Sequence, residues 1–309
     1  MAAPATSQTA HNKEWPPMLG ATPAEINDSL PQGPQLERGR PAKWLLAEHR
    51  KLDAALHVLV PQRKDRVDAY VVSVALDSDA VFGREAREAA RVLSHRFDAA
   101  GRTVTLAGSV GGGPGDLPNG SLNALTVTLA RVAELMDKDQ DVLVLYTTSH
   151  GAQVGIAYHD GDQGYGILSP ARLGAVLDEL GIRNRVLILS ACYSGIFVPA
   201  LANDTTALLT AASADRTSFG CQAENDWTFF GDALINHALR KPQPLDAAGA
   251  EARDTIGKWE AAGSLTPSKP QIVIGSRVAR WLAPLEDRMP ATATSPVGRP
   301  AADALEQAN

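Results

Sequence analysis

Short, unbroken apolar runs alternate with stretches of helical periodicity along most of the chain. Runs of strand length occupy residues 70–76, 103–107, 142–147, 186–189, 206–211 and 271–275. Their continuous apolar character is typical of strands that are buried on both faces of a parallel sheet. Helical spacing places helices near residues 86–97, 122–136, 170–180, 228–240 and 246–260. Strands that alternate with helices predict a doubly wound α/β sheet with right-handed crossovers.

Two of these predicted strands end in residues with catalytic chemistry. The run at 142–147 leads into Thr148, Ser149, His150 and Gly151, and the run at 186–189 leads to Cys192. Because ligands bind at the carboxyl edge of an open parallel sheet, we expect His150 and Cys192 to lie side by side there. A thiol beside an imidazole is the nucleophile and acid/base pair of a cysteine hydrolase. Gly151 fits the same site, since a backbone close to a substrate has no room for a β-carbon.

Other chemistries for Cys192 fail on spacing. A phosphatase loop needs Arg six positions later, where Val198 stands, and a redox motif needs a second Cys at the position of Gly195. No Gly-x-Ser-x-Gly elbow surrounds Ser190 or Ser194. The alternative is a buried structural cysteine, which is also the role expected of the second cysteine, Cys221.

The two strand ends resemble the catalytic blocks of a known enzyme group. An apolar run before Ser149-His150-Gly151 and another before Ala191-Cys192-Tyr193-Ser194-Gly195 are similar to those of the caspase-like cysteine peptidases. Within this group the chain resembles the legumain and GPI-transamidase family, in the form of a bacterial member. The caspase active-site pentapeptide is absent. The resemblance covers about residues 67–240. It implies a caspase-like three-layer α/β/α sandwich with a mostly parallel six-stranded sheet.

The resemblance also implies an activity. A cysteine endopeptidase would use Cys192 to form a thioester with the substrate, and His150 would act first as general acid and then as base toward water. The backbone N–H groups of Gly151 and Cys192 would form the oxyanion hole. Two alternatives remain open: a transamidase or ligase that resolves the same thioester with an amine, and an inactive binding module on the same scaffold.

The resemblance also implies a preference for the residue before the scissile bond. The resemblance assigns Arg84, Ser218 and Asp232 to a pocket for Asn or Asp before the scissile bond. Ser190 stands where the family has a pocket glutamate, which removes one acceptor for an amide. Phe82 falls near the place of the asparagine that orients the catalytic histidine.

Composition limits the partners and the compartment. The chain has 309 residues and a formal net charge of −6, without a basic cluster for nucleic acid or an apolar run long enough for a membrane span. We therefore expect protein or peptide substrates. Neither a cofactor nor a metal is expected, because the polar segment 159–164 lacks the further ligands of a calcium loop. No signal peptide is visible, so the chain reads as cytoplasmic unless an upstream export signal is missing.

The same patterns predict the domain organisation. Residues 1–40 and 286–309 are rich in Pro and small or polar residues and are expected to be disordered. A flanking helix is expected at 41–60, and the peptidase domain is expected at 61–285.

Overall fold

A six-stranded sheet forms the centre of the molecule. The structure is a computed structural model and describes residues 19–110, 113–114 and 117–305. Four of the five strand pairings are parallel, and the edge strand β12 is antiparallel to its neighbour. The strands lie in the order β12 (Gln271–Ile274), β11 (Thr206–Thr210), β10 (Arg185–Ser190), β6 (Val142–Thr148), β2 (Ala69–Ala75) and β3 (Thr103–Leu106). Every predicted strand coincides with one of these six.

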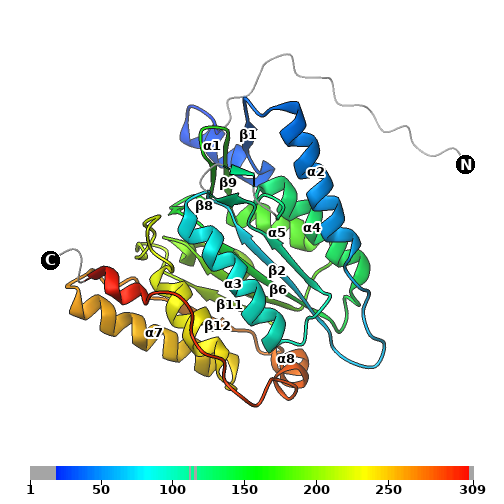
Figure 1. The fold of residues 1–309 in the computed structure, drawn as a ribbon, viewed down its shortest axis with the longest axis vertical. Helices are drawn as coiled ribbons and strands as arrows, with labels where there is room; N and C mark the ends of the chain where they lie inside the picture. The colour runs from blue at the N-terminus through cyan, green and yellow to red at the C-terminus, as the bar shows by residue number, and fades with distance from the viewer. Residues whose placement is uncertain (1–18, 111–112, 115–116, 306–309) are drawn as a thin grey trace, which may run out of the picture.

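Side chains alternate between two hydrophobic cores on opposite faces of the sheet. On β6, Val144 and Tyr146 point into one core, while Leu143 and Leu145 point into the other. Figure 1 shows α3 on one side of the sheet and α4 and α5 on the other. The first face is covered by α3 (Ala80–Arg96), η3 (Gly231–His237), α7 (Leu245–Ala262) and α8 (Ala279–Glu286). The second is covered by α2 (Ala42–His57), α4 (Leu122–Leu135), α5 (Pro170–Glu179) and α6 (Val198–Leu201). The fold is thus the predicted three-layer α/β/α sandwich.

A second, antiparallel sheet lies at the carboxyl edge of the first. Its strand order is β1 (Gln35–Glu37), β9 (Gly164–Leu168), β8 (Gly155–Asp160) and β7 (Gly151–Ala152). The segment 159–164, which the sequence suggested as a polar loop, is the turn between β8 and β9 together with the residues beside it. His159 bridges to Asp77 just beyond the end of β2, and the His159 carbonyl accepts a hydrogen bond from the Ser78 N–H at 2.9 Å. The hairpin is therefore anchored beside the strand ends that carry the candidate site.

The amino-terminal segment is more ordered than expected. Residues 19–40 contain α1 (Pro23–Ser29), η1 (Leu30–Gln32) and β1. Thr22 and Glu25 form a capping box at the start of α1, and β1 pairs along β9. The prediction of disorder is wrong for these residues because side chains cap the first helix and the backbone of β1 pairs with that of β9. Residues 1–18 of the expected disordered segment lie outside the described residues.

The carboxyl-terminal segment also packs on the domain. The Val297 carbonyl accepts hydrogen bonds from the Trp227 indole N–H at 2.8 Å and the Asn236 amide at 3.0 Å. The Ala301 N–H donates to the Asp232 carboxylate at 2.7 Å, and η5 (Ala301–Leu305) follows. The prediction of a disordered tail is therefore wrong for residues 286–305. Residues 306–309 lie outside the described part of the chain.

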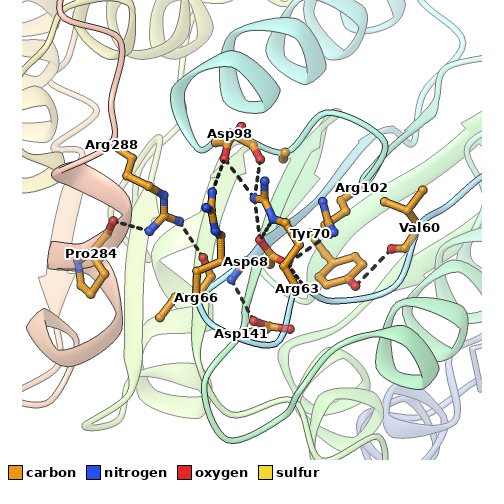
Figure 2. Close-up of polar contacts among 12 residues, drawn as sticks. Val60, Arg63, Arg66, Asp68, Tyr70, Asp98, Arg102, Asp141, Pro284 and Arg288 are labelled. Atoms are coloured by element: carbon orange, nitrogen blue, oxygen red, sulfur yellow. Dashed lines mark hydrogen bonds and ion pairs between the residues drawn. The ribbon is translucent and has the colours of Figure 1, made fainter.

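A buried polar cluster fixes the opposite, amino-terminal edge of the sheet (Figure 2). The carboxylate of Asp68 has no exposed surface and accepts hydrogen bonds from the backbone and side chain of Arg63. The Asp68 N–H donates to Asp141, which links the starts of β2 and β6. Arg288 reaches the Val67 carbonyl from beyond α8. These contacts align the two strands whose other ends lead into the candidate site.

The remaining short elements are β4 (Ser109–Val110), β5 (Gly113–Pro114), η2 (Ser194–Phe197) and η4 (Ala238–Arg240). The predicted helix at 228–240 is realised from residue 231 as the wide turns of η3 followed by the tighter turn of η4. None of the described helices combines the length and apolar character needed to cross a membrane.

Candidate active site

His150 and Cys192 occupy matching positions beyond the ends of two adjacent parallel strands. Thr148 of β6 is paired with Ser190 of β10. His150 lies two residues after Thr148, and Cys192 lies two residues after Ser190. The Ser149 N–H also donates to the Ser190 carbonyl at 3.2 Å, which continues the pairing beyond the strands. The sheet register therefore places His150 and Cys192 at neighbouring strand ends.

Gly151 makes this close approach possible. A β-carbon at this position would overlap the carbonyl oxygen of Cys192. The sequence suggested that glycine leaves room for a substrate, whereas the structure shows that the nearest neighbour is the backbone of Cys192. Gly151 is thus required by the packing of the two strand ends against each other.

The Cys192 thiol lies in a half-buried position among hydrogen-bond donors. Tyr193 takes a left-handed conformation with φ of 58°, and its N–H donates to the Arg216 carbonyl at 2.8 Å. This turn leaves the Cys192 sulfur 3.2 Å from the Ser218 N–H, which donates to it. A hydrogen bond from the Cys221 thiol, aided by the Ser218 N–H and the charge of His150, lowers the pKa of Cys192 to about 6 against the opposing effect of burial. The surroundings of the sulfur therefore favour its thiolate form.

Cys221 contributes to this thiolate in addition to packing. It packs partly buried against the cluster that contains Val81 and Phe82. Its hydrogen bond to Cys192, together with burial, raises the pKa of Cys221 far above its usual value. The proton of this thiol pair is therefore held more tightly by Cys221 than by Cys192, a role for Cys221 that the sequence did not reveal.

His150 is held by a carboxylate and an aromatic ring from the segment that follows β2. Its Nε2 lies 3.4 Å from an oxygen of Asp79, and the side chain is 46% exposed. The Phe82 ring packs edge-on against the imidazole, with ring centroids 5.0 Å apart. Phe82 thus orients the ring by packing, while Asp79 supplies the polar partner for Nε2. The position of Asp79 directly after a strand end was the signal that could have identified it.

Glu85 is a buried hub beneath the site. Its carboxylate has no exposed surface and accepts five hydrogen bonds. The donors are the Tyr146 hydroxyl, the Thr148 hydroxyl, the Ser190 hydroxyl and both the N–H and hydroxyl of Thr228. Glu85 therefore ties α3 to β6, β10 and the segment before η3. The sequence places it on a helix without indicating that it is buried.

The residues expected to form the substrate pocket are not gathered in one place. Ser190 is 2% exposed, and its hydroxyl is engaged with Glu85 and Thr228. Asp232 is fully buried, and its carboxylate binds Asn236 and the Ala301 N–H. In this structure neither side chain offers exposed surface to a substrate, so we remove both from the candidate pocket.

Two expected pocket residues remain at the surface. Ser218 is half-buried and contacts Cys192 through its backbone. Arg84 is partly exposed, and its guanidinium donates to the carbonyls of Ala223 and Asn225 and pairs with Asp226 at 3.6 Å. Arg84 therefore holds the loop that follows Cys221. It is the one cation among the four residues expected to form the pocket.

Comparison with known proteins gives one family match and structural matches at low identity. Residues 121–261 match the model of the Peptidase C13 family, a segment that contains His150, Gly151 and Cys192 but not Arg84. The crystal structure of caspase-1 from Spodoptera frugiperda is similar at 14% identity and a TM-score of 0.46, covering 70% of this chain and 93% of that one. No curated protein matches the chain.

Proposed function

Because residues 121–261 match the model of the Peptidase C13 family, we propose that the chain is a cysteine endopeptidase of this family in which Cys192 is the nucleophile and His150 is the general acid and base. One observation carries this proposal. The two residues follow paired positions on adjacent parallel strands. The donors around the Cys192 sulfur, which lower its pKa, support the same proposal. A half-buried structural cysteine has no need of donors that stabilise its anion.

The proposed reaction proceeds through a thioester. The Cys192 thiolate attacks the peptide carbonyl, and the N–H groups of Gly151 and Cys192 stabilise the resulting oxyanion. His150 then protonates the leaving amine as the C–N bond breaks and the thioester remains. Next, His150 removes a proton from water, which attacks the thioester and releases the acid and the thiolate. Since Nε2 faces Asp79, Nδ1 is the nitrogen assigned to these transfers.

Peptides and proteins are the proposed substrate class, with Asn or Asp before the scissile bond as the finer proposal. Arg84 supports the finer proposal because a guanidinium can donate to either side chain. Arg84 lies next to Glu85 in the chain. The Glu85 carboxylate accepts a hydrogen bond from the hydroxyl of Ser190, which stands two residues before Cys192. Without an exposed acceptor from Ser190 or Asp232, we expect Asp to be preferred over Asn.

Hydrolysis of a fluorogenic peptide library, varied at the residue before the scissile bond between about pH 4 and 8, tests both levels of the proposal. Cys192→Ala and His150→Ala should each abolish cleavage. Arg84→Ala should weaken cleavage after Asp at least about tenfold, as expected for loss of a charged contact. Arg91→Ala is the matched control, because Arg91 lies on the same helix with a side chain that is 75% exposed.

The outcomes distinguish the proposed catalytic mechanism from the proposed substrate pocket. Cleavage after a different residue that still requires Cys192 would retain the mechanism and reject the pocket. Turnover that persists in Cys192→Ala would reject the mechanism, and absence of turnover under all conditions would favour an inactive binding module.

A further inference from the structure

Three metal-binding side chains converge at the candidate site. Asp77 and Asp79 follow β2, and His150 follows the adjacent strand β6. Within the described part of the chain, one ligand atom from each of these residues lies within 4.8 Å of the other two. This cluster differs from the segment 159–164, which the sequence analysis weighed as a calcium loop and rejected.

One separation in the cluster resembles that between two ligands of one ion. His150 Nε2 is 3.4 Å from Asp79 Oδ2, which is long for a hydrogen bond, for which about 2.7 to 3.2 Å is usual. Ligands about 2.05 Å from a tetrahedral ion are separated by about 3.3 Å, so this pair needs little movement to share one.

The buried carboxylate of Asp77 provides independent evidence for a ligand. Asp77 is 2% exposed, and its Oδ1 accepts a hydrogen bond from the Asp79 N–H at 2.8 Å. Its Oδ2 is buried and receives no hydrogen bond; its nearest ion-pair partner is the half-exposed His159. A buried carboxylate oxygen is costly unless a donor or a cation satisfies it. Asp77 contributes a carboxylate oxygen to the cluster with Asp79 and His150, and a cation held there would compensate this buried carboxylate.

We propose that Asp77, Asp79 and His150 form a binding site for a divalent cation of the zinc class, and that this cation inhibits the peptidase reversibly. One imidazole and two carboxylates form a mixed nitrogen and oxygen set that binds Zn²⁺ more readily than Ca²⁺ or Mg²⁺. Three protein ligands leave a fourth position for water.

Inhibition follows from the loss of His150 as an acid and base, and this part of the inference rests on the proposed function. A cation on Nε2 would replace Asp79 as the partner of that nitrogen. The imidazole would then carry its remaining proton on Nδ1 as a neutral ring. Such a ring has no free lone pair to accept a proton from water, so the thioester could not be hydrolysed by the proposed route.

Isothermal titration calorimetry of Zn²⁺ into Cys192→Ala tests the site without any peptidase activity. We expect saturable binding of one ion per chain, with no comparable heat for Ca²⁺ or Mg²⁺. Asp79→Asn and Asp77→Asn should each weaken binding at least about tenfold, since even residues behind a metal ligand contribute that much. Asp79 is half-exposed, so Asp79→Asn is the variant less prone to misfold.

Asp162→Asn is the matched control, because Asp162 is an exposed carboxylate in the nearby β8–β9 turn. It should bind Zn²⁺ like its parent. The proposed site would be overturned by the absence of binding in Cys192→Ala, which would indicate a thiolate ligand, or by unchanged binding in Asp79→Asn.

Zinc titration of the wild-type peptidase tests the inhibitory consequence separately. Cleavage should fall as Zn²⁺ saturates the calorimetric site and should return when a chelator is added. Unchanged cleavage by a protein that binds one zinc ion would reject the inhibitory role. If the wild type cleaves no peptide, calorimetry still decides whether the metal site exists.

Discussion

The charge of a single sulfur atom depends on three neighbouring groups. Cys192 is stabilised as a thiolate first by the Cys221 thiol, then by the Ser218 N–H and by His150, while burial opposes them. The same interaction lowers the pKa of Cys192 and raises the pKa of Cys221, so we expect Cys192 to be the more reactive of the two cysteines.

Removal of Cys221 should make Cys192 less acidic. In the wild type, the alkylation rate of Cys192 by iodoacetamide should reach half its maximum near pH 6, where the thiolate forms. In Cys221→Ala the midpoint should move upward toward the ordinary value of about 8.5. Peptide mapping by mass spectrometry measures both sites, and Cys221 should remain unmodified in the wild type at neutral pH. An unchanged midpoint would show that the Cys221 thiol does not stabilise the anion.

The substitution Gly151→Ala tests the contact between the residues that follow β6 and β10. In Gly151→Ala the new β-carbon meets the Cys192 carbonyl, so the two reactive residues must separate. A displacement of about 1 Å typically costs about a hundredfold in rate. We expect kcat/KM to fall by at least that factor while the protein remains folded.

Gly257 in α7 provides the control for the same substitution. A β-carbon there meets nothing within 4 Å, so Gly257→Ala should leave activity unchanged and stabilise the helix by about 1 kcal/mol. Peptide hydrolysis and urea unfolding compare the two variants. Full activity in Gly151→Ala would contradict the packing described here.

At the scale of secondary-structure elements, Glu85 joins a helix to two central strands. Glu85→Ala would leave five donors without an acceptor and create a cavity below the site. Each buried donor left without an acceptor costs about 1 to 3 kcal/mol, so we expect a loss of at least about 3 kcal/mol of unfolding free energy. Tyr146→Phe removes one donor only and should cost about 1 kcal/mol. Urea unfolding of both variants tests this difference, and similar losses would show that Glu85 is not the shared acceptor.

The elements that sequence patterns predicted are those with regular burial. Each central strand is a continuous apolar run because both of its faces contact a core. The β8–β9 hairpin was missed because its strands are short, rich in glycine and only partly buried. The residues His150 and Cys192 were identified from strand ends, whereas Asp79 and Glu85 depend on contacts between residues far apart in the chain. No local pattern records such contacts.

At the scale of the whole molecule, the carboxyl-terminal segment closes one side of the domain. Trp227, Asp232 and Asn236 are buried, and all three bond to residues 297 or 301. The sequence suggested a disordered tail because the segment is rich in Pro and small residues. Backbone groups make most of these contacts, and composition does not reveal them.

Deletion of residues 290–309 should therefore destabilise the peptidase domain itself. It exposes an indole and leaves a buried carboxylate without its backbone donor, with each lost hydrogen bond costing about 1 to 3 kcal/mol. We expect a loss of at least about 3 kcal/mol by urea unfolding. An unchanged unfolding midpoint would show that the segment does not contribute to the stability of the domain.

The central claim is that Cys192 forms a thioester with the substrate, and trapping this intermediate tests the claim most directly. The protein would be mixed with a peptide ester, quenched with acid and analysed by mass spectrometry. We predict an adduct of the acyl mass on Cys192, absent from Cys221, lost in Cys192→Ala and released by neutral hydroxylamine. Hydrolysis without this adduct that continues in Cys192→Ala would contradict the account.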